Sequence, residues 1–221
     1  MNRSTGLFVA MALAVLTPSV AQAQEHTHEA PTPASVATIR PDDRVVGSMD
    51  APVTLTAYVS TTCSHCADWH ENYLPAIAAK YVETGQIRIV YRDLPTPPVD
   101  AAQAGALIAR CAAPERFDTV LGTLLRTQGA LRGTPTETED QKRERVIRWL
   151  GNAGVSGGMT PDQMNSCFST DANWDAFYAR IDASHADGVT GTPTFFVNGQ
   201  RAEVWDVTSL DAVVQPLLAA H

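Results

Sequence analysis

Residues 52–66 read PVTLTAYVSTTCSHC, and they join a predicted strand to a predicted helix. Apolar and polar residues alternate over its first nine positions, which is the pattern of a β-strand with one buried face. The apolar positions are Val53, Leu55, Ala57 and Val59. About twenty residues with helical periodicity follow Cys63, and Pro75 is expected to kink that helix because its ring removes one backbone hydrogen bond. The sequence therefore places a C-x-x-C motif where a strand turns into a helix.

The motif itself is Cys63-Ser64-His65-Cys66. Backbone N–H groups and the positive end of the helix dipole stabilise a thiolate at the first cysteine, and a thiolate is the species that attacks a disulfide. We therefore predict that Cys63 is the nucleophile and that Cys66 reaches back to resolve the mixed disulfide. Ser64 and His65 are predicted to tune the thiolate, since a protonated or hydrogen-bonding imidazole would favour it further.

Two other interpretations of the motif are weaker. A zinc site needs about four ligands, and the sequence has no second C-x-x-C, although His65 and His70 could in principle complete a set. A purely structural disulfide would close a loop too small to restrict the unfolded chain much. We predict a redox pair, with no metal site and no cofactor.

The remaining elements follow in a simple order. A strand is predicted at 86–92, a hairpin at 194–205 with Asn198-Gly199 as its turn, and a last helix at 209–219. Between them lies a helical block at about 99–187, with helices expected at 99–113, 114–128, 137–153, 161–169 and 171–187. The fold class is therefore α/β: a β-α-β half, a helical insertion, and a β-hairpin-α half, which is a thioredoxin-like plan.

The first 23 residues have the layout of a cleavable signal peptide. Arg3 precedes an apolar run at 7–16, and Ala21-Gln22-Ala23 is a cleavage signal, so we expect cutting after Ala23. An uncleaved anchor is the weaker interpretation, because the run is too short to span a bilayer. Residues 24–42 are predicted to be a flexible segment, and 43–221 the thioredoxin-like domain. The mature protein is expected in the periplasm or outside the cell, where disulfides persist.

Composition excludes some partners. The chain has 221 residues, of which 44% are hydrophobic and 18% charged, the balance of a globular protein long enough to bury a core. Its net charge is −8, whereas a nucleic-acid or anionic-membrane binder would need a basic face. No nucleic-acid partner is predicted.

Three stretches together resemble the DsbA-type thiol:disulfide oxidoreductases of bacterial envelopes. They are YVSTTCSHCADWH at 58–70, IRIVYRDLP at 87–95 and GVTGTPTFFVNG at 188–199, and the resemblance extends over most of 43–220. It implies that Pro193, preceded by Thr192, is a cis-proline facing the cysteines, where it leaves backbone groups free to pair with a bound peptide.

The sequence departs from the family pattern at three places. The dipeptide between the cysteines is Ser64-His65 where the best-known members carry Pro-His. Thr192 resembles the isomerase-like and several other branches rather than the enterobacterial oxidants. Ala57 occupies the position where many relatives place a buried Glu or Asp that moves the proton of the resolving thiol. Another group or water must do that work here, or Cys66 is deprotonated more slowly.

Cys111 and Cys167 lie on predicted helices of the insertion. In an oxidising compartment two leftover thiols most economically pair with each other, and relatives in one DsbA branch resemble this chain in carrying a second disulfide at matching places. We predict a structural Cys111–Cys167 bridge beside the redox-active Cys63–Cys66 pair. The alternative is a second redox pair that tunes the first.

The function that these features predict is a periplasmic or secreted dithiol oxidase. It would introduce disulfides into reduced, unfolded secretory proteins, and the resemblance implies re-oxidation by a membrane thiol oxidase. A monomer is expected. The alternatives are a disulfide isomerase or reductase of the same fold, and a non-enzymatic metal- or client-binding module that uses the two cysteines as ligands.

Overall fold

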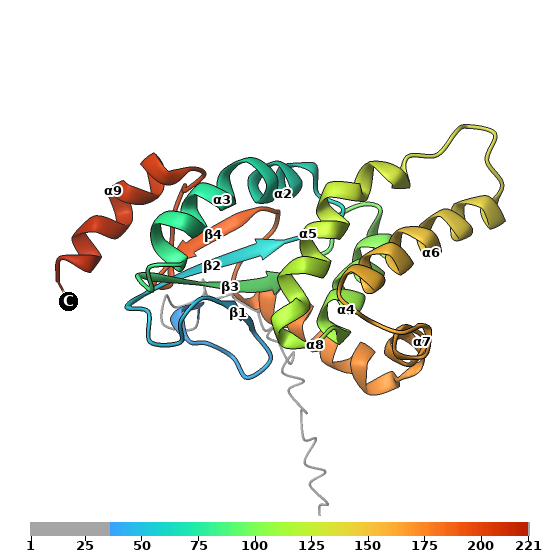
Figure 1. The fold of residues 1–221 in the computed structure, drawn as a ribbon, viewed down its shortest axis with the longest axis horizontal. Helices are drawn as coiled ribbons and strands as arrows, with labels where there is room; N and C mark the ends of the chain where they lie inside the picture. The colour runs from blue at the N-terminus through green and yellow to red at the C-terminus, as the bar shows by residue number, and fades with distance from the viewer. Residues whose placement is uncertain (1–35, 221) are drawn as a thin grey trace, which may run out of the picture.

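Five strands form a mixed sheet in the order β1-β3-β2-β4-β5 (Figure 1). They are β1 (Arg44–Val46), β2 (Val53–Val59), β3 (Ile87–Asp93), β4 (Thr194–Val197) and β5 (Gln200–Arg201). β2 and β3 run parallel, and the other neighbouring pairs run antiparallel. The computed structural model describes residues 36–220, so the predicted signal peptide (1–23) and residues 24–35 of the predicted flexible segment lie outside the described residues.

The central strand β2 is buried along its whole length. The alternating pattern predicted one buried face, but the polar face is covered as well. Thr54 is only 4% exposed and accepts a hydrogen bond of 2.8 Å from Arg88 Nε, and Tyr58 is fully buried. Hydroxyl groups on this face therefore find polar partners within the fold, which lets the strand sit between two covered faces.

A helical segment with alternating α and π turns follows β2 and lies over one face of the sheet (Figure 1). It consists of α2 (Ser64–Asp68), a π-helical turn at Trp69–Tyr73, α3 (Leu74–Ile77) and a second π-helical turn at Ala78–Val82. Pro75 stands at the start of α3, where its missing N–H removes no bond within that helix. The break in the α-helical pattern that was expected at Pro75 occurs instead in the π-helical turn directly before α3.

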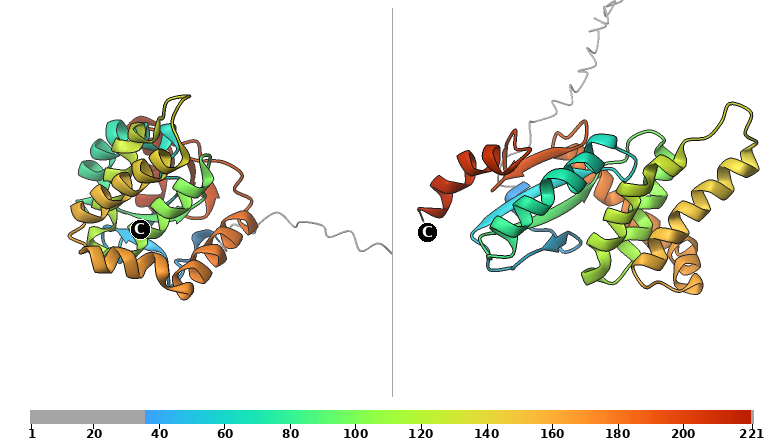
Figure 2. Two further views of the ribbon diagram at one scale, coloured as in Figure 1. Left: turned by 90° about the vertical axis from the view of Figure 1, so that its right-hand side faces the viewer. Right: turned by 45° about the horizontal axis from the view of Figure 1, so that its top comes forward.

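The helical insertion stands at one end of the sheet, away from the last helix (Figures 1 and 2). Its helices are α4 (Val99–Cys111), α5 (Phe117–Thr127), α6 (Glu139–Ser156), α7 (Pro161–Ser169) and α8 (Asp171–Ala186). Thr138 and Thr160 begin α6 and α7 with capping boxes. The last helix, α9 (Val207–Leu218), begins after the N-cap Asp206. The predicted α/β order, including the insertion, is confirmed.

The structure corrects the sequence prediction at two strands. β1 was not predicted, because three residues are too few to show a period. The second strand of the hairpin predicted at 194–205 was wrong beyond Arg201, where β5 ends. Val204 is 3% exposed and packs in the core, so the chain after β5 does not continue the hydrogen-bonded pairing with β4.

The end of the predicted flexible segment was also predicted wrongly. Val36 is 2% exposed and packs in a small apolar cluster that contains Tyr58 and Val189. Residues 36–42 therefore pack against the folded domain. Among all the residues that the structure describes, 36–220, no helix is both long and apolar enough to cross a bilayer.

Candidate redox site

The end of β2 and the start of α2 position the two cysteines. Cys63 is the N-cap of α2, and the backbone N–H of Cys66 donates to its sulfur at 3.3 Å. A sulfur at this position therefore stands in for the oxygen that usually caps a helix. Cys63 is partly exposed, Cys66 is fully buried, and both are free thiols in this structure. Ser64 and His65, between them, are exposed.

The loop before β4 faces Cys63 from the other side. The Thr192–Pro193 peptide bond is cis, and the Cys63 thiol donates to the Thr192 carbonyl at 3.3 Å. Apart from its interaction with the two cysteine sulfurs, the buried Thr192 hydroxyl has no hydrogen-bond partner among the described residues. β4 begins directly after this loop, where Thr194 stands opposite Tyr58 of β2. The sheet thus brings the C-x-x-C motif and the Thr192-Pro193 pair together.

The two thiols have very different pKa values. A hydrogen bond from the Cys66 thiol, assisted by Thr192 and by the backbone N–H groups of Cys66 and His65, lowers the pKa of Cys63 to about 5, against the opposing effect of burial. Burial, followed by the hydrogen bond and the charge of Cys63, raises the pKa of Cys66 well above its ordinary value. The pair can therefore hold one thiolate, on the accessible sulfur, at neutral pH.

The insertion also reaches this site. Gln128, in the turn that follows α5, donates from Nε2 to the Cys63 carbonyl at 3.2 Å and to the Leu125 carbonyl at 3.1 Å. Nothing in the local sequence around Gln128 signals this role, because the contact joins residues 65 positions apart. The insertion therefore helps to fix the backbone at the first cysteine.

Ala57 is fully buried in β2, with Tyr91 of β3 as its register partner. Burial and the nearby Asp118 raise the pKa of Tyr91 well above its ordinary value. Asp118 Oδ1 lies 3.4 Å from Nε2 of His70, which is itself mostly buried. Next to the position that lacks a carboxylate, the structure therefore holds a polar cluster of His70, Tyr91 and Asp118 that the sequence did not reveal.

Cys111 and Cys167 are joined by a disulfide. It links the end of α4 to α7, and Cys167 is 2% exposed. The bridge lies within the insertion, and it closes a segment of 56 residues.

A groove of about 340 Å³ lies beside the Thr192-Pro193 loop. It is lined by Pro193, Thr194, Phe195, Arg201, Ala202, Glu203, Val204 and Trp205. Within residues 36–220, no three His, Cys, Asp or Glu side chains are grouped so that they could hold a metal ion.

The lowered pKa of Cys63 predicts a pH-dependent stability of the reduced protein. The pKa falls from 9.0 to about 5 on folding, so the stability that the thiolate contributes is complete above pH 9 and is lost as the pH falls through 5. At pH 7 this contribution is on the order of 1–2 kcal/mol, once solvent screening at the partly exposed sulfur is taken into account. Between pH 5 and pH 8 Cys66 contributes little, since its thiol stays protonated in the folded protein and almost entirely so in the unfolded chain.

Denaturant unfolding of the reduced and oxidised proteins between pH 5 and pH 8 measures this effect. We expect the stability of the reduced protein relative to the oxidised one to increase with pH over this window, because the disulfide form has no thiolate to lose. A difference that stays constant over this window would contradict the lowered pKa.

The fold and the cysteine pair are those of the thioredoxin-fold thiol:disulfide oxidoreductases. The chain belongs to the thioredoxin family: the family profile described as thioredoxin matches residues 40–215. This finding confirms the thioredoxin-like fold that the sequence predicted.

Relatives and solved structures agree with this family. A Rickettsia bellii protein named "Putative protein-disulfide oxidoreductase" is 29% identical over 91% of this chain and 74% of its own length. A similarly named Rickettsia typhi protein is 26% identical, and the match spans 62% of its length. The crystal structure of Wolbachia pipientis alpha-DsbA1 has a TM-score of 0.70 at 21% identity, covering 86% of this chain and 97% of that one. The resemblance to DsbA-type proteins is thus confirmed.

Proposed function

We propose that this protein is a periplasmic dithiol oxidase that introduces disulfides into reduced, unfolded secretory proteins. The observation that carries the proposal is the separation of the two thiol pKa values, with a stabilised thiolate on Cys63 and a buried, protonated Cys66. Stabilising the dithiol form raises the reduction potential of the pair, which makes its disulfide a strong oxidant.

Exchange with a client would proceed in two steps. A client thiolate attacks the sulfur of Cys63 in the Cys63–Cys66 disulfide, a mixed disulfide forms, and Cys66 leaves and takes up a proton. A second client thiolate then attacks the client sulfur of the mixed disulfide and releases Cys63 as a thiolate. The client loses two electrons and the pair gains them, so the reaction balances.

The groove beside Pro193 supports binding of an extended client segment next to the disulfide. Its lining combines Pro193 and the first residues of β4 with the residues that follow β5. In this proposal Thr192 and Pro193 bind the client, while Ser64 and His65 tune the thiolate.

Regeneration runs the exchange in the opposite direction, again through a mixed disulfide at Cys63. The Cys63 thiolate attacks a disulfide of a membrane thiol oxidase, and Cys66 resolves the resulting mixed disulfide, so that the electrons leave through that partner. The signal-peptide layout of residues 1–23 supports export to the periplasm, and we expect the mature protein to be a monomer. The Cys111–Cys167 bridge is assigned a structural role.

The reduction potential of the Cys63–Cys66 pair tests this proposal. Mature protein is equilibrated in glutathione buffers and its free thiols are alkylated, with a Cys111→Ser/Cys167→Ser variant as the control for the second pair. We expect a potential well above that of the glutathione pool. A potential near that of thioredoxin would contradict the oxidase and favour a reductase or isomerase. Stoichiometric bound metal that is lost in Cys63→Ser would favour a metal-binding module.

A further inference from the structure

A buried carboxylate stands at the start of the loop that faces Cys63. Asp187 follows the last residue of α8, its side chain is 2% exposed, and it comes five residues before Thr192. A buried carboxylate is unfavourable unless it is paired and hydrogen-bonded, so its partners show what it holds in place.

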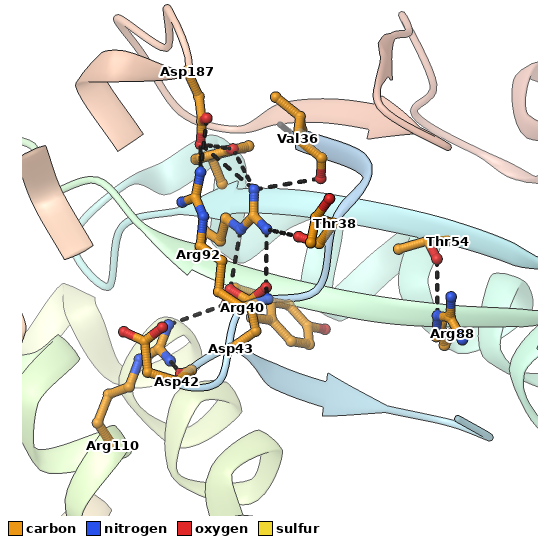
Figure 3. Close-up of polar contacts among 12 residues, drawn as sticks. Val36, Thr38, Arg40, Asp42, Asp43, Thr54, Arg88, Arg92, Arg110 and Asp187 are labelled. Carbon is orange, nitrogen blue, oxygen red and sulfur yellow. Dashed lines mark hydrogen bonds and ion pairs between the residues drawn. The ribbon is translucent and has the colours of Figure 1, made fainter. Parts of the chain in front are cut away.

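Three side chains from distant parts of the chain converge on this carboxylate. The Tyr58 hydroxyl, from β2, donates to Oδ2 at 2.5 Å. Arg40 Nη2 lies 2.7 Å from Oδ1 and 2.6 Å from Oδ2, and Arg92 Nη1, from β3, lies 3.5 Å from Oδ2 (Figure 3). Because burial and the bond to Asp187 raise the pKa of Tyr58, its hydroxyl stays protonated and remains a donor at neutral pH.

Arg92 ties this group to the packed N-terminal residues. It donates from Nε and Nη2 to Asp43 at 3.0 and 2.9 Å, and to the carbonyls of Val36 and Thr38 at 3.4 and 2.8 Å (Figure 3). Arg92 also donates to the Tyr58 hydroxyl at 3.0 Å. The buried arginine therefore keeps a carboxylate partner in Asp43 even when Asp187 is changed.

The loop is anchored on both sides of Thr192 and Pro193, by apolar packing before them and by a hydrogen bond from β4 after them. Val189 is fully buried in the cluster that contains Val36 and Tyr58. On the other side of the loop, the Thr194 hydroxyl donates to the Gly191 carbonyl at 2.8 Å. Between these anchors the backbone of Thr192 is presented to Cys63.

Two contacts join the segment that leads to Cys63 with the segment that leads to Thr192, and the Tyr58–Asp187 hydrogen bond is the first of them. From Tyr58 the chain runs five residues forward to Cys63, and from Asp187 it runs five residues forward to Thr192. The two paths meet again where the Cys63 sulfur lies 3.3 Å from the Thr192 carbonyl. A change in the spacing at one contact can therefore reach the other along two segments of only five residues each.

We propose that Asp187 is a positioning residue which, through its hydrogen bond to Tyr58, holds the Thr192-Pro193 loop against Cys63. This role deepens the proposed function and rests on it. Asp187 does not touch the reacting sulfurs, and it acts through the position of Thr192. The side-chain hydroxyl of Thr192 is one of the groups that lower the pKa of Cys63, so moving the loop away from Cys63 weakens the thiolate.

Three variants of the full mature protein test this role, with the thiolate absorbance of Cys63 titrated against pH. Asp187→Asn keeps the shape and removes the charge, and Tyr58→Phe removes only the hydroxyl.

Asp93→Asn is the matched control, because Asp93 is also buried and also binds two arginines, Arg110 at 2.9 Å and Arg180 at 3.3 Å. We expect the first two to raise the pKa of Cys63 by about half a unit, a roughly threefold change in its dissociation constant, and the control to leave it unchanged.

If Asp187→Asn does not fold, Tyr58→Phe still tests the same hydrogen bond. An unchanged Cys63 pKa in the folded test variants, or an equal rise in Asp93→Asn, would overturn the inference. The proposed function is judged separately, by the reduction potential of the parent protein. A parent potential near that of thioredoxin together with a raised pKa in Asp187→Asn would contradict the oxidase while supporting the positioning role.

Discussion

Cys66→Ser is expected to accumulate as a covalent complex with its exchange partners, whereas Cys63→Ser is expected to form none. In this structure Cys63 is the accessible sulfur with the lowered pKa, and Cys66 is fully buried behind it. Without Cys66, a mixed disulfide at Cys63 has no internal thiol to resolve it. Loss of Cys63 should reduce the rate of thiol–disulfide exchange by roughly a thousandfold or more, the scale seen when a covalent nucleophile is removed.

Non-reducing electrophoresis after incubation with a reduced, unfolded client and an oxidant measures both outcomes. Complexes should disappear when a reductant is added. The Cys111→Ser/Cys167→Ser variant serves as the control and should exchange thiols at the parent rate. Full turnover by Cys66→Ser, or complexes formed through Cys66 in Cys63→Ser, would show that the roles of the two cysteines are assigned wrongly.

Removing the second disulfide is expected to produce the largest loss of stability. The bridge joins residues separated by 56 positions, and a loop of this length corresponds to about 4 kcal/mol in the chain-entropy model. For a protein of this size, that loss lowers the melting temperature by roughly 10 °C. Thermal unfolding of Cys111→Ser/Cys167→Ser, with the Cys63–Cys66 pair held in one redox state, measures the effect.

The same variant separates the structural role of this bridge from the redox alternative. A structural bridge leaves the Cys63–Cys66 potential unchanged while the melting temperature falls. If the potential shifts and the stability does not, then Cys111 and Cys167 act as a second redox pair that tunes the first. The double variant is preferred to either single one because a single change leaves a reactive thiol behind.

Local patterns predicted the elements that carry the chemistry. The alternation up to Val59 and the helical period after Cys63 located the junction that makes Cys63 an N-cap. The helix at 161–169 was predicted with its correct limits, because Thr160 and Pro161 together form a strong start signal.

The parts that the sequence did not reveal depend on distant residues. Gln128 and Cys63 are 65 positions apart, and Tyr58 and Asp187 are 129 positions apart. Such contacts leave no period in the chain, since each partner is a single polar residue in an otherwise ordinary segment. Residues 36–42 were misjudged for the same reason: their composition is that of a solvated tail, and the side chains that bind their carbonyls, among them Arg92 and Arg110, lie far away in the sequence.

The ion pair between Arg40 and Asp187 has a consequence for how the chain acquires its structure. Its two residues are separated by 147 positions, so a chain that enters a compartment with its N-terminus first cannot form this bond until Asp187 has also arrived. Contacts of such long range form late, after the entropy of closing the intervening chain has been overcome. We therefore expect Arg40 and its neighbours to dock only after Asp187 has arrived, and a chain that stops before Asp187 leaves Arg40 without this partner.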